Sequence, residues 1–319
     1  MKVYEGLDAI TVPFLASSVA IGTFDGVHVG HQAIIAAAIE DARRHQRPAL
    51  VFTFDRHPIE LFAPDKAPDL ITTPEQRNAL IAELGADGLV IARFDTALSL
   101  LSPDAFLERI LKGMLGAKAI VEGVNFVFGK DRAGDVNYLE RVQSQYDFTL
   151  LALEPVLVHD QPASSTRVRE RLRARDIAEA EAILGHPYCL IGTVVGGQRL
   201  GRTLGYPTAN LQPTARQVIP GDGIYAVVAT LDDGRSVGGA CSIGERPTIE
   251  GAGRSIETFL LDFDEDIYGR GMELRFIAWL RGEAKFNSLT ELTEQMAKDV
   301  IATRSILAAK ILYKSFESR

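Results

Sequence analysis

The pattern of apolar and polar positions along the chain changes near residue 185. Before it, short apolar runs typical of buried strands alternate with stretches in which apolar residues recur every three or four positions, as on one side of a helix. The expected strands are residues 18–23, 49–54, 88–92 and 118–122, and the expected helices are residues 31–46, 75–84 and 103–115. This alternation predicts an α/β domain, with a parallel sheet that is covered by helices on both faces. Ligands of such sheets bind beyond the carboxyl ends of the strands.

After residue 185, glycine and proline become frequent and helical spacing disappears until the end of the chain. Short runs with alternating polarity predict strands at residues 188–195, 224–231, 236–243, 256–263 and 272–280. Their close spacing predicts an all-β antiparallel barrel or sandwich, followed by a helical tail at residues 288–316. We therefore expect two domains, residues 1–185 and residues 186–319.

Composition narrows the range of partners. The 319 residues carry a formal net charge of −8, with a pI of about 5.4, which argues against a nucleic-acid-binding protein. The two cysteines form no CxxC pair, the first residues contain no apolar signal segment, and no apolar run is long enough to cross a membrane. We expect a cytoplasmic protein without nucleic-acid or membrane partners and with at most weak self-association.

The densest set of chemically useful residues follows the first expected strand. Residues 22–31 read Gly-Thr-Phe-Asp-Gly-Val-His-Val-Gly-His. The glycines allow a tight turn and a close approach to a ligand, and the helix that begins here offers free N–H groups to a phosphate. His28 and His31 share one face of the first helical turn, where their imidazoles can hydrogen-bond phosphate oxygens as charge builds up.

Other cofactor motifs fit this part of the chain less well. Residues 123–130 are one residue too long for a P-loop, and Asp131 stands where a serine or threonine would hold magnesium. A metal bound by the two histidines would need a third ligand, which spacing alone does not identify.

As a whole, residues 22–31 resemble the signature of the nucleotidyltransferase superfamily. They resemble in particular its bacterial bifunctional riboflavin kinase/FMN adenylyltransferase (FAD synthetase) branch. Residues 52–58 resemble the TFxPHP segment of that family, with Arg56 where proline is usual. Residues 164–169 match its SSTxxR motif, which combines small N-cap residues with an arginine that suits phosphate.

A third segment, residues 123–134, resembles the GxDFRFGxxRxG of the family, with Asn125 at the acidic position and Val127 at the usual arginine. The resemblance implies that His28 and His31 stabilise ATP while the FMN phosphate attacks its α-phosphorus and pyrophosphate leaves. It assigns ATP binding in this domain to Gly22, Phe24, Gly30, Asn125, Ser164, Ser165, Thr166 and Arg169. It also makes three aromatic residues candidates for holding the flavin ring, although phenylalanines are as often simple core residues. These are Phe62, Phe106 and Phe128.

In the second domain, residues 201–210 read Gly-Arg-Thr-Leu-Gly-Tyr-Pro-Thr-Ala-Asn and resemble the flavokinase signature. Thr208 and Asn210 are two positions apart and point the same way on an extended segment. Their hydroxyl and amide oxygens are hard ligands that suit Mg²⁺ together with phosphate oxygens. With Gly201 and Arg202, they form the expected ATP and magnesium site.

Downstream, residues 243–248 resemble IGxRPT and residues 281–287 resemble RxExKF. Residues 257–269 resemble ETHLLDFxxDLYG, with Phe259 where histidine is common. By itself Glu257 would read as an exposed strand residue, but it aligns with the catalytic glutamate of the family, a general base for the ribityl 5′-hydroxyl.

The implied second fold is a six-stranded Greek-key barrel with a C-terminal helix, on which Asp299 and Arg304 are expected to meet the flavin. The implied activity is ATP-dependent phosphorylation of riboflavin to FMN, followed by adenylylation of FMN to FAD, with Mg²⁺. The Rossmann-like first domain would carry the second of these steps.

Three alternatives differ in class from this interpretation. Residues 240–244 nearly match the GxSxG of serine hydrolases, but all histidines precede Ser242, whereas that family places its histidine after the serine. A non-catalytic flavin-binding regulator would be expected to lose the histidine pair and Glu257, which are present. An enzyme with only one of the two activities remains an alternative, given the departures at Arg56, Asn125 and Val127.

Overall fold

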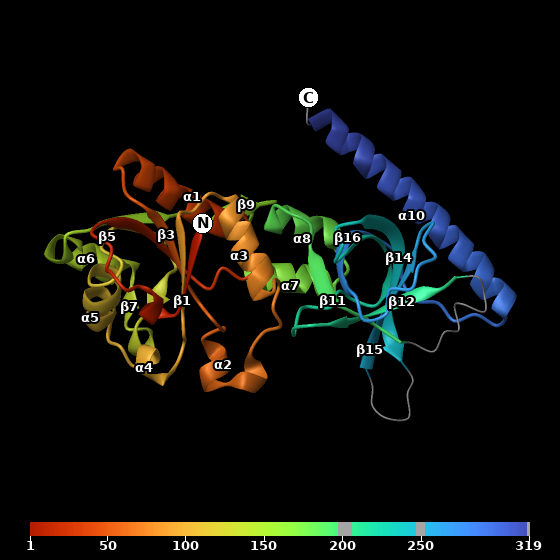
Figure 1. Cartoon of the computed structure of the whole chain (residues 1–319), viewed down its shortest axis with the longest axis horizontal. Coiled ribbons are helices and arrows are strands. Elements are labelled where there is room, and N and C mark those ends of the chain that lie inside the picture. The colour runs from red at the N-terminus through yellow and green to blue at the C-terminus, as the bar shows by residue number, and fades with distance from the viewer. Residues whose placement is uncertain (197–205, 247–252, 318–319) are drawn as a thin grey trace. The chain divides into compact units, whose positions relative to one another are not determined.

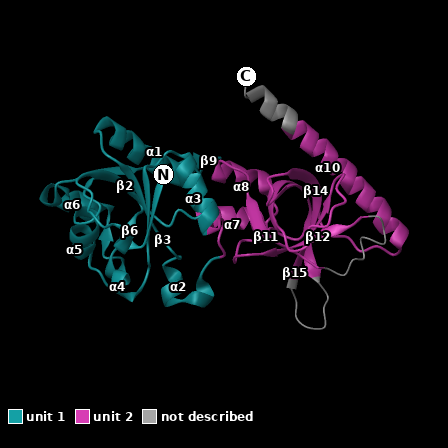
Figure 2. Cartoon of the chain, viewed as in Figure 1, with its two compact units in different colours: residues 1–68, 74–164 teal, residues 69–73, 165–319 magenta. Residues whose placement is uncertain are grey.

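The computed structural model describes residues 1–196, 206–246 and 253–317. Contacts divide the chain into two compact units, one made of residues 1–68 and 74–164 and the other of residues 69–73 and 165–319 (Figure 2). The α/β and all-β halves expected from the sequence are both present (Figure 1).

The first unit is built on a six-stranded parallel sheet with the order β1–β4–β3–β2–β5–β8. Its strands are β1 Lys2–Glu5, β2 Ser17–Ile21, β3 Ala49–Phe54, β4 Gly88–Ala92, β5 Ala117–Gly123 and β8 Thr149–Leu153. The middle strands are buried almost throughout, as expected of parallel strands that are covered on both faces. Strand order reverses between β2 and β5, so the loops that leave these two strands border the crevice in which such sheets bind ligands.

Helices cover both faces of this sheet. On one face, Ile35 of α1 (Val29–Arg44) and Ile81 of α3 (Pro74–Glu83) pack on the sheet beside Val121. On the other face, Leu107 packs beside Ile120. The other α-helices and strands of this unit are α2 Ile59–Phe62, α4 Thr96–Ser99, α5 Pro103–Phe106, β6 Val127–Phe128, β7 Gly134–Asp135, α6 Val136–Tyr146, β9 Leu157–Val158 and β10 Gln161–Pro162. Three 3-10 helices, Leu7–Ala9, Pro64–Lys66 and Lys130–Arg132, lie between elements of this unit.

The helix expected at residues 103–115 is present, with a change of winding. After α5, residues Leu107–Lys112 form a π-helical stretch. The N–H of Gly113 there bonds the carbonyl of Glu108, five residues back, rather than four.

The second unit contains a closed antiparallel barrel with the order β11–β12–β15–β14–β13–β16. Its strands are β11 Cys189–Val195, β12 Thr208–Pro213, β13 Gly223–Leu231, β14 Ser236–Arg246, β15 Gly253–Leu260 and β16 Gly271–Arg281. The connections from β12 to β13 and from β15 to β16 pass over intervening strands, which gives the Greek-key arrangement that was predicted. The rings of Tyr225 and Phe276 fill the interior edge to face, with 5.3 Å between their centroids, so the barrel encloses a packed core.

Helices surround this barrel. The C-terminal helix α10 (Leu289–Glu317) lies against β13, β14 and β16, and Lys310 on it pairs with Glu181 at 2.6 Å. Glu181 belongs to α8 (Ile177–Leu184), which follows α7 (Ser165–Arg173). Within the described residues, no helix combines the length and the apolar character needed to cross a bilayer.

A short piece of the N-terminal half of the chain, residues 69–73, belongs to this second unit. The N–H of Leu70 bonds the carbonyl of Arg216, and its carbonyl accepts from the N–H of Val218, both at 2.8 Å. The contact division at residues 164/165 places α7 and α8 with the barrel. The functional boundary expected at residues 185/186 remains a prediction.

Candidate active sites

The loop after β2 forms a tight turn before α1. Phe24, Gly26 and Val27 all have positive φ angles, of 50°, 82° and 40°. A Cβ atom on Gly22 would lie 3.1 Å from the Phe24 ring, and one on Gly30 would lie 3.1 Å from the His28 ring. A larger residue at Gly22 or Gly30 would therefore have to shift a neighbouring ring, and Gly26 is the glycine of the motif that holds a left-handed turn conformation.

The two histidines expected at this turn are in direct contact. His28 caps α1, with its Nδ1 accepting the N–H of His31 at 3.3 Å, and the two rings stack with 3.6 Å between their centroids. Burial lowers the pKa of His28 to about 4, and burial together with His28 lowers the pKa of His31 well below its usual value. Both imidazoles are therefore neutral at pH 7 before a ligand binds. The Nδ1 of His31 is buried and has no hydrogen-bond partner within the part of the chain that the structure describes.

A cavity of about 400 Å³ opens over this turn, between the loops that follow β2, β5 and β8. We call it the loop pocket. It brings together six of the residues assigned to ATP from the sequence: Gly22, Phe24, His28, Gly30, His31 and Asn125. This position beside the strand-order reversal is where an open parallel sheet binds nucleotides.

An aromatic cavity of about 600 Å³ adjoins the loop pocket. We call it the aromatic pocket. Its rings are Phe54, Phe94 and Phe126 together with the three predicted flavin residues, Phe62, Phe106 and Phe128. Phe106 and Phe128 also belong to the hydrophobic core, whereas Phe62 is 69% exposed. The two pockets meet, because both are lined by Ile21, Phe54, Pro58, Phe126 and Val127.

Two buried ionisable residues support this site and were not identified from the sequence. The guanidinium of Arg77 donates to the carbonyl of Phe54 at 3.0 Å and to that of Thr23 at 3.5 Å, and so joins the loop after β2 to the end of β3. Glu122 at the end of β5 is 3% exposed, and its Oε1 accepts the N–H of Ile21 at 2.9 Å. The only sequence signal for Glu122 was a charge that interrupts an apolar run.

The SSTxxR motif lies at the start of α7. Ser164 ends the first unit, whereas Ser165, Thr166 and Arg169 belong to the second. The Arg169 side chain is 7% exposed, and its Nε donates to the carbonyl of Asp69 at 2.7 Å. The contacts of these four motif residues with ATP remain a prediction.

In the second unit, a cavity of about 330 Å³ lies between the outer face of the barrel and α10. We call it the barrel pocket. Glu257 on β15 lines it, between the fully buried Ile256 and Thr258. Glu257 stands directly opposite Asn210 on β12, and its Oε2 accepts the hydroxyl of Thr208 at 3.3 Å. Strand register thus assembles the three polar residues predicted for the kinase step.

Of the two helix residues expected at the flavin, the structure places one in this pocket. Asp299 lines it, accepts two hydrogen bonds from Arg281 at 2.9 and 2.7 Å, and is fixed further by Gln295. Arg304 does not line the barrel pocket and instead forms a two-pronged ion pair with Asp262, at 2.7 and 2.6 Å.

A second cavity of this unit, of about 310 Å³, also borders Thr208. We call it the acidic pocket, because Asp264, Glu265 and Asp266 form part of its wall, beside Phe263. Thr208 lines both this pocket and the barrel pocket, so the two meet at its hydroxyl.

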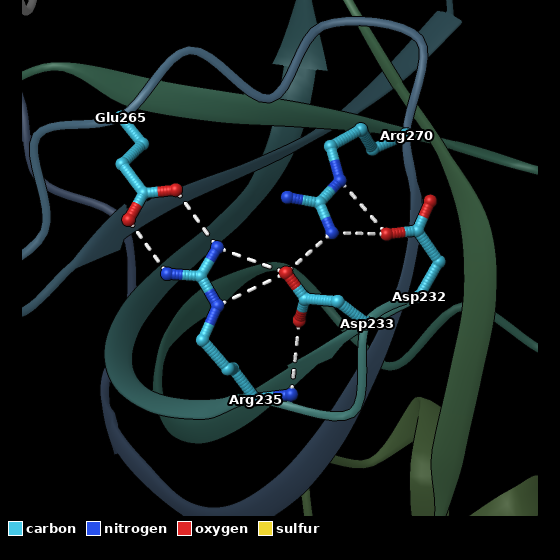
Figure 3. A network of polar contacts seen from close by, with 5 residues as sticks. All are labelled: Asp232, Asp233, Arg235, Glu265 and Arg270. Atoms are coloured by element: carbon cyan, nitrogen blue, oxygen red, sulfur yellow. Dashed lines mark hydrogen bonds and ion pairs between the residues drawn. The ribbon is translucent and has the colours of Figure 1, made fainter.

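A network of charges holds the wall of the acidic pocket (Figure 3). Arg235, on the β13–β14 hairpin, grips both oxygens of Glu265 at 2.6 and 2.8 Å, and its Nε bonds Asp233 at 2.9 Å. Arg270 bonds Asp233 at 2.7 Å and also pairs with Asp232. Sequence reasoning missed this network, because its members come from a hairpin and from a loop whose proximity depends on barrel closure.

The predicted phosphate residues Gly201 and Arg202 lie outside the described residues. In residues 1–196, 206–246 and 253–317, no three His, Cys, Asp or Glu side chains gather as a metal cluster. Mg²⁺ does not need such a cluster, since it binds through few protein oxygens and the phosphates of its nucleotide.

Two family models match this chain, one in each half. A family model described as FAD synthetase matches residues 15–167, and one described as riboflavin kinase matches residues 184–307. The bifunctional riboflavin kinase/FMN adenylyltransferase of Escherichia coli K12 is 37% identical over 95% of this chain and 97% of its own length. The proteins of the same name from Pseudomonas fluorescens and Bacillus subtilis are 38% and 35% identical, over 97% and 89% of this chain and 98% and 90% of their own lengths.

A solved structure also matches nearly the whole chain. A crystal structure titled macrolide-efflux protein, from Streptococcus pneumoniae, is 31% identical, with a TM-score of 0.86, over 95% of this chain and 99% of that chain. Its title differs from the names of the curated relatives.

Proposed function

This chain belongs to the family of bifunctional riboflavin kinase/FMN adenylyltransferases, and we propose that its two units divide the two steps of FAD synthesis. The second unit phosphorylates riboflavin to FMN, and the first joins FMN to the adenylyl group of a second ATP. The observation that carries this division is that each unit holds two adjoining pockets. In the first unit, the aromatic pocket is suited to a flavin ring and the loop pocket contains residues predicted to bind phosphate. In the second unit, Thr208, which is predicted to bind phosphate and magnesium, lines both pockets where they meet.

For the kinase step, we place riboflavin in the barrel pocket and the uncharged adenosine part of the nucleotide in the acidic pocket, against its aromatic residues Phe263 and Tyr268, with the phosphates directed toward Thr208 and away from the carboxylates. The γ-phosphate then lies near Thr208, where the two pockets meet. Glu257 takes the proton of the ribityl 5′-hydroxyl, whose oxygen attacks the γ-phosphorus as ADP leaves. The hydroxyl of Thr208 and the amide oxygen of Asn210 fit Mg²⁺, which would neutralise charge on the transferred phosphoryl group.

For the adenylyl step, we place the flavin ring of FMN in the aromatic pocket and ATP in the loop pocket. An oxygen of the FMN phosphate attacks the α-phosphorus, and pyrophosphate leaves, so no protein nucleophile is required. The neutral imidazoles of His28 and His31 and the free N–H groups at the start of α1 stabilise the charge that develops on the phosphate oxygens.

The test is to incubate the purified protein with riboflavin, ATP and Mg²⁺ and to separate the flavins by chromatography over time. We expect FMN to appear first and FAD to follow. A parallel reaction that starts from FMN isolates the second step. If neither reaction yields FAD but riboflavin is converted to FMN, the protein has only the kinase activity. If FAD forms from FMN but not from riboflavin, it has only the adenylyltransferase activity.

The expected cytoplasmic location and weak self-association belong to the same proposal. Neither Cys189 nor Cys241 takes part in a disulfide within the described residues.

A further inference from the structure

A carboxyl group that neither reaction step uses lies at the centre of the first unit. Glu122 is the last residue but one of β5, and its Oε1 accepts the N–H of Ile21, the last residue of β2. These are the two strands between which strand order reverses. The Glu122 side chain therefore bridges the two strand ends at the crevice where the sheet binds its ligands.

This bridge stands where the two substrates must meet. Glu122 lines the loop pocket, and its partner Ile21 lines both the loop pocket and the aromatic pocket. If ATP occupies the first pocket and the flavin ring of FMN the second, the FMN phosphate reaches the α-phosphorus at the border between them. Glu122 lies beside that border.

We propose that Glu122 is a further substrate-contacting residue of adenylyl transfer. One carboxyl oxygen holds the end of β2, and the other, as a hydroxyl, donates a hydrogen bond to a phosphate oxygen of ATP or FMN. This inference rests on the proposed function of the first unit.

Because both substrates carry negatively charged phosphates, this role requires the Glu122 carboxyl to be protonated. An ionised carboxylate beside two phosphates would repel both, whereas a protonated carboxyl supplies one O–H donor. Burial raises the pKa of Glu122 well above its usual value, although the N–H groups of Ile21 and Gly123 oppose part of this rise. Bound phosphates would raise it further, since neighbouring negative charge favours the neutral acid.

Other titratable groups surround the same place, and any test must separate Glu122 from them. β2 has no titratable side chain. Titratable side chains from the start of α1 and from the segment after β8 line the loop pocket, and three others line the aromatic pocket. They are His28, His31 and Glu154 in the loop pocket, and His57, Asp131 and Arg132 in the aromatic pocket.

Two substitutions distinguish a hydrogen-bond donor from a negative charge. Glu122→Gln keeps an acceptor for Ile21 and a donor for phosphate, and it has no proton to lose. We expect it to retain the wild-type kcat for FAD formation from FMN within about twofold at pH 7. Glu122→Leu has similar bulk but neither polar group, and we expect it to lower kcat by about 10²-fold, the usual effect of losing one preorganised donor. The KM for FMN should change less than kcat, because the ring contacts are unaltered.

The pH profile supplies a readout that a purely structural role would not alter. The protonated acid is the active form, so activity is present below its raised pKa and is lost as pH rises through that pKa. Wild-type FAD formation should therefore decline on the alkaline side, and this decline should be absent in Glu122→Gln. Glu140→Gln, the same exchange on the exposed side of α6, should leave the wild-type profile unchanged. Riboflavin phosphorylation by each variant reports on the other unit and should stay constant.

If Glu122→Leu makes FAD as fast as the wild type, Glu122 has no role in the step. If Glu122→Gln is as slow as Glu122→Leu while kinase activity is intact, the reaction needs a negative charge and the donor role is wrong. If the wild type itself forms FMN but no FAD, the proposed function of the first unit fails, which is a different result from either of these.

Discussion

The stacked histidines at the start of α1 should make the stability of the first unit depend on pH, and His28→Asn should remove the part of that dependence that His28 contributes. Asparagine is a strong N-cap residue, and its side-chain oxygen can accept the N–H of His31 in place of Nδ1. The substitution therefore keeps the cap and removes the titrating ring.

The sign follows from comparing the folded and unfolded chains. The folded pKa of His28 is about 4, against 6.5 for an ordinary histidine, so the unfolded chain takes up the proton more readily. The stability contributed by the neutral ring is present above pH 6.5 and is lost as pH falls toward 4. Its full size is about 3.4 kcal/mol, of which about 2 kcal/mol is lost between pH 7 and pH 5. His31, whose pKa is also lowered, adds to the loss in the same direction.

The two units must be followed separately, because a single unfolding curve would mix them. The one tryptophan, Trp279, lies on β16, so its fluorescence in urea reports only on the barrel. Hydrogen exchange of the β2 and β5 amides, corrected for intrinsic exchange rates, reports the opening free energy of the first unit. Between pH 7 and pH 5, the wild type should lose about 2 kcal/mol more of this free energy than His28→Asn.

His159→Asn is the matched control, since His159 is exposed and has a φ of 49°, which asparagine tolerates. The opening free energy of the first unit in His159→Asn should change with pH as it does in the wild type. Equal pH dependence in the wild type and His28→Asn would refute the reasoning, because it would mean that folding does not depress the pKa of His28.

Four further substitutions test other parts of the structure. Glu257→Gln should lower riboflavin phosphorylation by about 10²–10⁴-fold, the usual cost of losing a general base, without changing FAD formation from supplied FMN; equal loss of both would contradict the division of labour. Phe62→Ala should raise the KM for FMN several-fold without affecting folding, because the ring is largely exposed; an unchanged KM would place the flavin elsewhere. Arg235→Gln should raise the KM for ATP of the kinase step alone, because the wall of the acidic pocket loses its ion pairs. Added salt screens the same ion pairs, so it should raise the KM for ATP of the wild type toward that of the variant. Phe276→Ala should lower the unfolding free energy of the barrel by about 3–5 kcal/mol, measured by tryptophan fluorescence.

The strands that could be predicted from the sequence are those in which a run of apolar residues indicates burial. Residues 49–54 and 88–92 are continuous apolar runs, and the structure gives the same limits to β3 and β4. The edge strand β1 reads Lys-Val-Tyr-Glu, with most side chains exposed, and is defined mainly by its pairing with β4. It was missed, because no apolar run marks a strand of this kind.

The candidate sites show the same limit. The motif containing His28 and His31 is local in sequence, and so is the signature that contains Thr208 and Asn210, so both could be proposed as site residues from the sequence and its family resemblance. Glu122 was missed, because its partner Ile21 is 101 residues away and is a backbone group, which leaves no pattern in the side chains. The acidic pocket was missed for a similar reason, since its wall depends on how the barrel closes.

The path of the chain through its two units limits how the protein can be divided. The polypeptide enters the second unit for residues 69–73, returns to the first, and crosses again at residues 164/165. The backbone carbonyl of Asp69 accepts from Arg169, and its carboxylate pairs with Arg173 and Arg216 at 3.1 and 2.7 Å. A ribosome therefore releases this segment long before its arginine partners are made. No single cut, whether by a protease or by splitting the gene, yields both units complete.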